Sequence, residues 1–279
     1  MIPQSPLKRF FLHPSGLVGT IILLAVAFMA ISASFFFPDS PWKMVARPNT
    51  WPLTQPGLPL GTDGMGRNLL SFLMYGARVS ILVGLAAAAA AVFIGTIVGA
   101  VSGYYGGRIG DFLMRLTDAM QTVPSFLAAI LIVGVIGPSL GTIITSIAIV
   151  SWPMVARLVR AEFLRLRGLD FVQGCLVMGM SDARIILTQI LPNCLSPIFV
   201  STSLLVATAI IIESSLSFLG LGDPNVMSWG ALIGNGRSVM RVAWYITLIP
   251  GAAVVLTVLA LNLIGDALND VFNPRLRTR

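Results

Sequence analysis

The side chains that could carry out chemistry are few and scattered along this chain. His13 is the only histidine, and Cys175 and Cys194 are the only cysteines. A nucleophile paired with histidine, or an HExxH zinc site, needs histidines at a defined spacing, which one residue near a terminus cannot supply. We expect His13 to be solvated, and we predict no catalytic residue and no metal site. The sequence therefore does not favour an enzyme.

Nucleotide binding by this chain is not expected either. A phosphate-binding loop requires a Gly-rich turn followed by Gly-Lys-Ser/Thr. The only lysines, Lys8 and Lys43, follow Leu7 and Trp42. No cofactor is predicted in the chain, so energy for any active process has to come from a partner that binds ATP.

One acidic residue, Glu213, lies near the end of a long apolar run in AIIIESSLSFLGLG. An ionisable side chain in a membrane helix is costly, and it is a functional candidate for that reason. Glu213 could meet a transported solute or a partner protein on the translocation path. It could equally be a helix-end residue in water, and both interpretations stay open.

A polar stretch that begins at Asp170, DFVQGCLVMGMSDARIILTQILPN, separates two strongly apolar runs. Asp170 would begin a short helix, where a carboxylate favours the positive end of the helix dipole. Gly179 would end that helix in a left-handed cap, and Ser181 or Asp182 would cap the next one. Pro192 would break the second helix just before the following apolar segment. The pattern predicts a short helix, a glycine turn and a second helix that returns to the membrane.

Composition places the chain in a membrane. Of its 279 residues, 56% are hydrophobic and only 10% are charged, and the mean hydropathy is +0.89. A soluble domain is about a quarter charged. The net charge of +7 is spread over predicted loops, so it indicates membrane topology and does not favour nucleic-acid binding.

Six apolar segments predict an all-α integral membrane protein with six transmembrane helices. The first, 16–37, is too long for the apolar core of a cleavable signal peptide, about 7–15 residues. It follows a tail at 1–15 and precedes a polar loop at 38–78, which must lie outside the hydrocarbon. A five-helix core, 79–268, and a tail at 269–279 complete the chain. The core spans are expected at about 79–101, 120–136 with a kink at Pro124, 141–155, 195–216 and 244–264, with a loop at 157–193.

Two spacing patterns predict contacts of the core helices. Glycines recur every fourth residue at Gly95, Gly99 and Gly103, which places small residues on one helix face for close packing. Charges of alternating sign share one helical face at three- and four-residue spacing and allow a ladder of ion pairs, at Arg108, Asp111, Arg115 and Asp118. We interpret this ladder as a solvated amphipathic extension, with contact to a partner subunit as the alternative.

The distribution of cations predicts the orientation. With the N-terminus in the cytoplasm, the inner side holds most of the Lys and Arg residues, as the positive-inside bias requires. The polar stretch from Asp170 and both tails then face the cytoplasm. Both cysteines fall on that side, where a disulfide is not expected. The inner cations are Lys8, Arg9, Arg108, Arg115, Arg157, Arg160, Arg165, Arg167, Arg184, Arg275, Arg277 and Arg279.

The stretch from Asp170 resembles the "EAA" loop of ABC importer permeases, which has an acidic residue, two small residues, a glycine four residues later and a final Leu-Pro. The matching positions are Asp170, Gly174, Cys175, Gly179, Leu191 and Pro192. The small pair is Gly-Cys in place of Ala-Ala, and Asp170 replaces the usual Glu. A glycine inside a helix costs about 0.5–1 kcal/mol relative to alanine. The resemblance implies that this segment, with Arg184, forms a cytoplasmic coupling helix that docks on an ATP-hydrolysing subunit.

Other segments are similar to the dipeptide/oligopeptide/nickel permease family, and to its C-type permease, so the resemblance covers essentially the whole chain. The first is an outer-loop motif at Gly61, Thr62, Asp63, Gly66, Arg67 and Asn68, followed by Tyr75, Gly76, Arg78 and Ser80. From composition alone this motif predicts only a tight turn with an Asp–Arg contact. The others are Ser214–Gly222, Ser228–Trp229–Gly230 and the C-terminal LNLIGDALNDVFNPRL.

The resemblance implies the type I ABC importer permease fold and a set of partners. These are a second homologous permease subunit, two ATP-binding subunits, an extracytoplasmic substrate-binding protein and the lipid bilayer. Peptides, or nickel or opine-like small solutes, would be the cargo. A secondary, ion-coupled transporter or channel subunit is the alternative, but it needs ionisable groups or broken helices near mid-membrane, and Glu213 lies toward one end.

Overall fold

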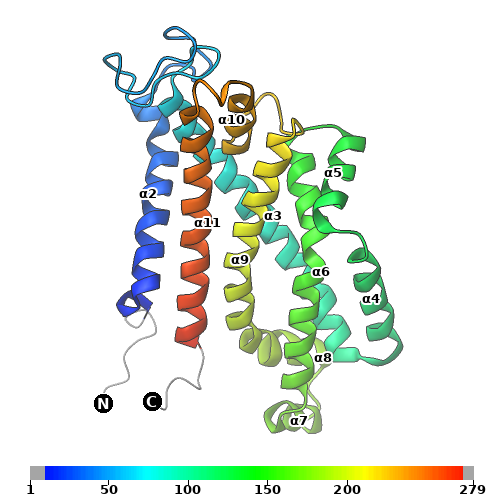
Figure 1. Ribbon diagram of the computed structural model, residues 1–279. Helices are drawn as coiled ribbons and strands as arrows, with labels where there is room; N and C mark the ends of the chain where they lie inside the picture. Colours follow the sequence, from blue (N-terminus) through cyan, green and yellow to red (C-terminus); the bar gives the residue numbers. More distant parts are fainter. Residues whose placement is uncertain (1–9, 273–279) are drawn as a thin grey trace.

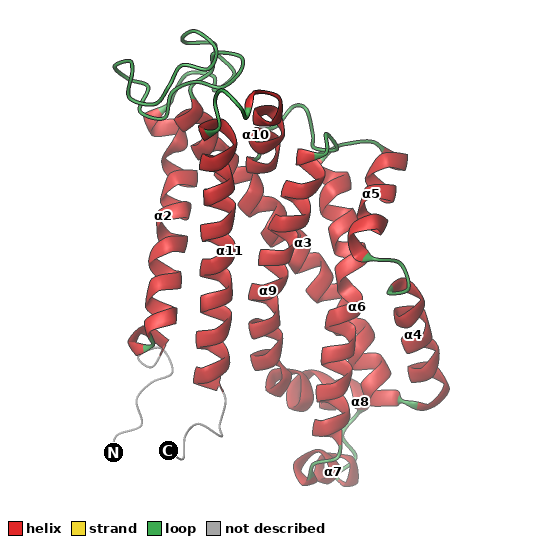
Figure 2. Cartoon of the chain, in the orientation of Figure 1, coloured by secondary structure: helices red, strands yellow, loops and turns green. Residues whose placement is uncertain are grey.

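The structure, a computed structural model, describes residues 10–272. In that range the regular elements are helices, apart from two isolated backbone bridges in the segment 37–68. Long helices stand side by side and form one bundle (Figure 1, Figure 2). In chain order the elements are α2 (Pro14–Phe36), α3 (Leu69–Tyr105), α4 (Gly107–Met120), α5 (Ser125–Ile136), α6 (Leu140–Arg167), α7 (Asp170–Val177), α8 (Asp182–Ile185), the π-helical turn η1 (Ile186–Ile190), α9 (Leu191–Phe218), α10 (Trp229–Gly236), the 3-10 turn η2 (Arg237–Val239) and α11 (Tyr245–Phe272).

Within residues 10–272, five helical runs are long and apolar enough to cross a membrane. They are α2, α3, α6, the continuous run of α8, η1 and α9, and α11. The pair α4 and α5 meets the same criterion together but is bent by 78° at its junction. The structure therefore confirms an all-helical membrane fold, with five continuous spans, or six when the bent pair counts as one span.

The two ends of the bundle differ. The short helix α7 projects from one end, where α2 begins and α11 finishes (Figure 1). We call this the α7 end. The segment 37–68 and the short helix α10 cover the opposite end, which we call the α10 end. On one flank α2 packs against α11, and α10 lies against α9 and α11.

Packing of α3 on α6 forms the centre of the bundle, and the glycine stripe explains it. A Cβ at Gly95 would lie 2.5 Å from the Val155 side chain, and one at Gly103 would lie 2.6 Å from that of Phe163. A Cβ at Gly99 would lie 2.6 Å from the Ala156 carbonyl oxygen. No side chain fits at these separations, so the three glycines let the two backbones approach closely. The predicted close-packing face is confirmed.

Several helices extend beyond the predicted spans. The second span begins at Leu69, not at residue 79, because the Asn68 side chain caps it by accepting hydrogen bonds from the backbone amides of Leu70 at 3.0 Å and Ser71 at 3.4 Å. The fourth span continues to Arg167, so the basic cluster from Arg157 onward lies on α6 and not in a loop. Hydropathy detects only the part of a helix inside the bilayer, whereas these helices extend past it.

The third predicted span, 120–136, is wrong in its first residues. Met120 ends α4, and α5 begins only at Ser125. Pro124 precedes α5 directly, and because proline lacks the amide hydrogen a helix needs, the chain breaks here completely where a kink was predicted. The predicted ladder of ion pairs on α4 is also absent from the described residues, where Asp118 pairs instead with Arg157 of α6 at 2.6 Å.

His13 is not simply a solvated tail residue. It precedes the first turn of α2, its Nδ1 lies 2.6 Å from the Ser15 hydroxyl, and its Nε2 lies 3.2 Å from the Asp270 carboxylate on α11. This half-exposed contact joins the ends of the first and last spans. The tails predicted at 1–15 and 269–279 are described only in part. Residues 1–9 and 273–279 lie outside the described range, with the predicted inner cations Lys8, Arg9, Arg275, Arg277 and Arg279.

Candidate functional site

The short helix α7 has the predicted geometry. Asp170 is its first residue, and Gly179 follows its end with φ of +75°. The Met180 amide donates to the Cys175 carbonyl at 3.1 Å and the Gly179 amide donates to the Leu176 carbonyl at 3.0 Å. This pair of bonds is a Schellman motif, which requires a left-handed residue at the position of Gly179. The sharp turn lets α7 lie across the end of the bundle.

One side of α7 is anchored and its tip is exposed. Val172 and Cys175 are buried in a core cluster that also contains residues of α6, α8, η1 and α9. By contrast, Val177 is 90% exposed and Met178 75% exposed. A Cβ at Gly174 would meet nothing within 4 Å, so packing inside this chain does not require a glycine there. α7 is thus a rigidly mounted apolar projection.

The turn after α7 is also fixed to the bundle. Asp182 accepts a 2.8 Å hydrogen bond from the Tyr104 hydroxyl at the end of α3. The predicted cap by Ser181 or Asp182 is not formed, because the Asp182 carboxylate is engaged with Tyr104 and Ser181 makes no side-chain cap. Arg167 lies over the Tyr104 ring, with its guanidinium carbon 5.5 Å from the ring centre. These contacts tie the turn to α3 and α6.

Pro192 does not break the helix that contains it. It lies in the first turn of α9, and the run from Asp182 to Phe218 is continuous. The preceding π-helical turn, Ile186–Ile190, is wider than an α-helical turn and accommodates a residue that has no amide to donate. Of the candidate coupling residues, Asp170, Gly174, Cys175 and Gly179 lie together in α7 and its turn. Arg184 and Pro192 are exposed on the following helical run.

The outer-loop motif at the α10 end forms a buried ion pair, as its composition predicted. Both Nε and a terminal nitrogen of Arg67 reach one Asp63 oxygen, at 2.7 and 2.6 Å, and both side chains are buried. The other Asp63 oxygen accepts the backbone amides of Met65 and Arg67, each at 2.9 Å. Gly61 and Gly66 have φ of +75° and +79°, and Thr62 bridges to Arg47 and Thr50. The motif is a rigid turn.

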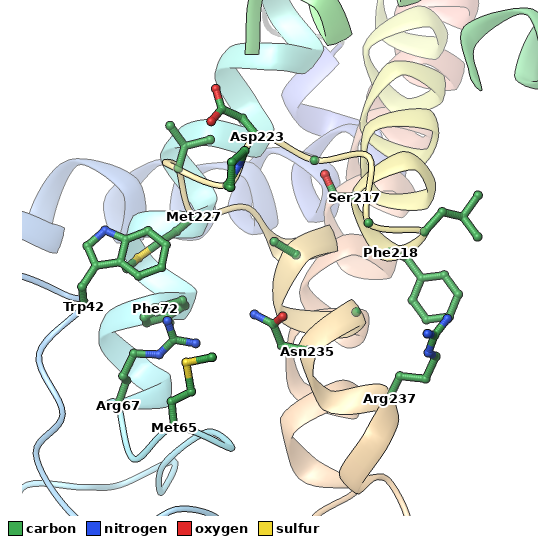
Figure 3. Close-up of a pocket in the computed structure, with 17 residues that line it drawn as sticks. Trp42, Met65, Arg67, Phe72, Ser217, Phe218, Asp223, Met227, Asn235 and Arg237 are labelled. Carbon is green, nitrogen blue, oxygen red and sulfur yellow. The ribbon is translucent and has the colours of Figure 1, made fainter. Parts of the chain in front are cut away.

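This turn forms one wall of a pocket of about 420 Å³ at the α10 end. Arg67 stacks over Phe72, and Trp42 lies beside them. Asn235 of α10 faces them, whereas Arg237 of η2 points away and lies over the Phe218 ring (Figure 3). The loop after α9 closes the pocket. There, backbone amides of Asn225 and Leu140 hydrogen-bond the carboxylate and lower the pKa of Asp223. Asp223 thus connects this loop to the start of α6.

Glu213 is 2% exposed and lies in a polar cluster between three helices. Its carboxylate accepts hydrogen bonds from Ser217 at 2.8 Å and from Ser80 of α3 at 3.4 Å. The Ser80 hydroxyl also accepts the backbone amide of Trp229, the first residue of α10, at 3.3 Å. The interpretation of Glu213 as a helix-end residue in water is therefore wrong. Its role on a translocation path stays a prediction.

Comparison with known proteins identifies the family. Residues 91–278 match the model of the family described as binding-protein-dependent transport system inner membrane component. The chain belongs to this family. It is accordingly a multi-pass inner-membrane protein and a permease component, as its motifs indicated.

Relatives of this permease cover nearly the whole chain. The DppC permease protein of the di/tripeptide transport system of Pseudomonas aeruginosa is 36% identical over 99% of this chain and 95% of its own. The OppC permease protein of the oligopeptide transport system of Haemophilus influenzae is 37% identical over 98% and 88%. A Brucella abortus relative, named provisionally as a peptide transport system permease protein, is 40% identical over 97% and 91%.

A solved structure shows the same fold at low identity. The MetNI methionine ABC transporter, in inward-facing conformations, matches this permease with a TM-score of 0.59 at 14% identity, over 72% of this chain and 97% of that one. The type I ABC importer permease fold is thereby confirmed.

Trp229 and Tyr245 organise the α10 end of this permease, a role that the sequence did not predict for either. Trp229 is fully buried and donates from its indole nitrogen to the Leu73 carbonyl at 2.9 Å. Tyr245 donates to the carbonyls of Thr50 and Thr62, at 2.8 and 3.0 Å. A signal for the first existed in the sequence, since a tryptophan in Ser228–Trp229–Gly230 is flanked by residues that cap and pack closely. Nothing in the sequence pointed to Tyr245.

Proposed function

We propose that the chain is one of two permease subunits of an ATP-driven importer that moves peptides across the inner membrane. A second homologous permease subunit, two ATP-binding subunits and an extracytoplasmic binding protein would complete the complex. The family description, which names binding-protein dependence, supports the last partner. The relatives of the di/tripeptide and oligopeptide transport systems support the cargo. ATP would be bound and hydrolysed by the partner subunits, so this chain needs no cofactor and is not itself an enzyme.

The structure of α7 is the observation that supports this proposal most strongly. Its exposed apolar tip can bind a partner protein, and its buried side is fixed to the bundle. A helix that transmits movement from one protein to another needs both features. We place the α7 end and both tails in the cytoplasm, because the cations of α6 cluster toward that end. The ATP-binding subunits would dock there, and the binding protein would dock at the α10 end.

The contacts of α7 suggest how movement would be transmitted. Closure of the ATP-binding subunits would displace α7 as a rigid unit. Its core cluster and the Tyr104–Asp182 hydrogen bond would carry the displacement into α3, α6 and α9. These helices would then alternate between inward and outward access. ATP drives the change only because the partners bind the two states with different free energies.

A matched pair of substitutions tests this docking site. Met178 at the tip of α7 is 75% exposed, and Met44 in the loop at the α10 end is 74% exposed. We expect Met178→Asp to prevent co-purification of the ATP-binding subunits, because it places a charge in an apolar contact, whereas Met44→Asp retains them. Both variants should insert in the membrane at wild-type levels. Retention of the ATP-binding subunits by both variants would refute docking on α7.

A further inference from the structure

The break between α4 and α5 lies near the middle of the membrane. α5 has 12 residues, so at 1.5 Å per residue it is about 18 Å long, little more than half of a hydrocarbon core of about 30 Å. Across from the break lies Ser151, about 17 Å along α6 from its first residue by the same rise. Measured from the turn between α5 and α6, both lengths place residues 121–124 at mid-depth.

Irregular backbone at this depth cannot face lipid. Residues 121–126 are all exposed on the surface of the chain. In the hydrocarbon, unpaired backbone groups are tolerated only where they meet protein or line a water-filled cavity. A groove of about 370 Å³ runs beside the break between α6 and α9, and polar side chains contribute to its lining: Gln121, Ser125, Ser151 and Thr208. These groups favour water over lipid as the content of the groove.

Charged groups continue this polar surface toward the α7 end. The exposed charged face of α4 carries Arg108, Asp111, Arg115 and Asp118, and lipid would not accept it. Asp118 and Arg157 form an ion pair that is still half-exposed. Asp118 is two residues from Met120, and Arg157 is one helical turn from Met154; both methionines line the groove. A carboxylate and a guanidinium group therefore lie together at the rim of the groove.

We propose that this groove, with the Asp118–Arg157 pair at its rim, is where the chain contacts the transported solute, a peptide with free amino and carboxylate groups. The solute ammonium would replace Arg157 at Asp118, and its carboxylate would replace Asp118 at Arg157. The hydroxyls and the amide in the groove would hydrogen-bond the peptide groups. This inference rests on the proposed function and specifies where and how its cargo is bound.

Two exposed threonines in membrane helices provide a matched test of the groove. Thr208 lines it and Thr145 does not, and the hydroxyl of each bonds a carbonyl of its own helix. The complete importer is reconstituted in liposomes, and uptake of a radiolabelled tripeptide and ATP hydrolysis are measured together. Thr208→Trp should lose most uptake per ATP hydrolysed, and Thr145→Trp should behave as wild type. Wild-type uptake by Thr208→Trp would overturn the groove assignment, whereas absence of ATP-dependent uptake in the wild type would overturn the proposed function.

A labelling experiment covers the case in which the tryptophan variant does not fold. The native thiols of Cys175 and Cys194 are free but buried. Labelling of an introduced cysteine can therefore be distinguished from labelling of the native ones. We expect a membrane-impermeant, cationic thiol reagent to modify Thr208→Cys and Ser151→Cys in the assembled complex, and to leave Thr145→Cys unmodified. Protection of both groove cysteines with and without ATP would show that protein or lipid fills the groove and would overturn the inference.

The charge assignment has its own test. Asp118→Asn should lower the uptake ratio of a free-amino peptide to its N-acetylated form by about two- to fivefold, the range for a partly exposed ion pair. The two peptides are chosen so that the binding protein retains them equally. Asp111→Asn, on the same exposed face, should leave the ratio unchanged. An equal fall in uptake of both peptides for Asp118→Asn would show that the pair has only a structural role.

Discussion

Replacing Gly99 by alanine should separate the two central helices. The added Cβ would lie 2.6 Å from the Ala156 carbonyl oxygen and 2.7 Å from the Val159 Cβ. The first of these is a backbone atom and cannot rotate away, so α3 and α6 must move apart. Overpacking of a filled site costs about 1–3 kcal/mol. The control is Gly251→Ala in α11, where an added Cβ would meet nothing within 4 Å. There, alanine should stabilise the helix by about 0.5–1 kcal/mol.

The expected difference between the two variants is therefore about 1.5–4 kcal/mol. It can be measured as the free energy of unfolding of the purified chain in mixed micelles with increasing sodium dodecyl sulfate, followed by far-ultraviolet circular dichroism. Two variants of equal stability would refute the close approach of α3 and α6 at this position.

Three further predictions concern the α10 end, each measured as the stability of the purified chain in detergent. Glu213→Ala should destabilise it by about 1–3 kcal/mol, because buried hydroxyls lose their acceptor, and Glu213→Gln should cost less; equal losses would contradict the role of the acceptor oxygen. Arg67→Ala should cost about 3–5 kcal/mol because it leaves the buried Asp63 carboxylate unpaired, whereas Lys43→Ala, in an exposed pair of the same i,i+4 spacing, should cost less than about 1 kcal/mol. Asp223 has a lowered pKa, so its stabilising contribution should be complete at neutral pH and disappear as the pH falls through that lowered value, below its usual 3.8. The difference in unfolding temperature between wild type and Asp223→Ala should shrink over that acidic range, and a difference that begins to shrink near neutral pH would contradict the assignment.

Features encoded within a few residues could be predicted from the sequence. The turn at Gly179, the helix that begins at Asp170 and the Asp63–Arg67 contact each depend on local spacing and on one conformational requirement. The glycine stripe at Gly95–Gly103 was equally predictable, because residues four apart lie on the same face of a helix. The apolar segments predicted the fold class, and the turn at Gly179 with the helix start at Asp170 predicted the position of α7.

Features that depend on distant residues could not be predicted. Glu213 contacts Ser80 across 133 residues, and Ser80 contacts Trp229 across 149. No periodicity connects such positions. The break before α5 was underestimated because one proline predicts only a loss of hydrogen bonding, and the surrounding packing decides whether the helix bends or stops. Pro192 shows the opposite outcome, since a π-helical turn preserves the helix there.

Peptide uptake into liposomes that contain the complete importer, with ATP supplied on the side of α7, tests the central claim most directly. We expect accumulation to require both ATP and the binding protein, and Met178→Asp to abolish it although the variant inserts in the membrane at wild-type levels. Accumulation driven by an ion gradient without ATP, or full transport by Met178→Asp, would contradict an importer coupled through α7.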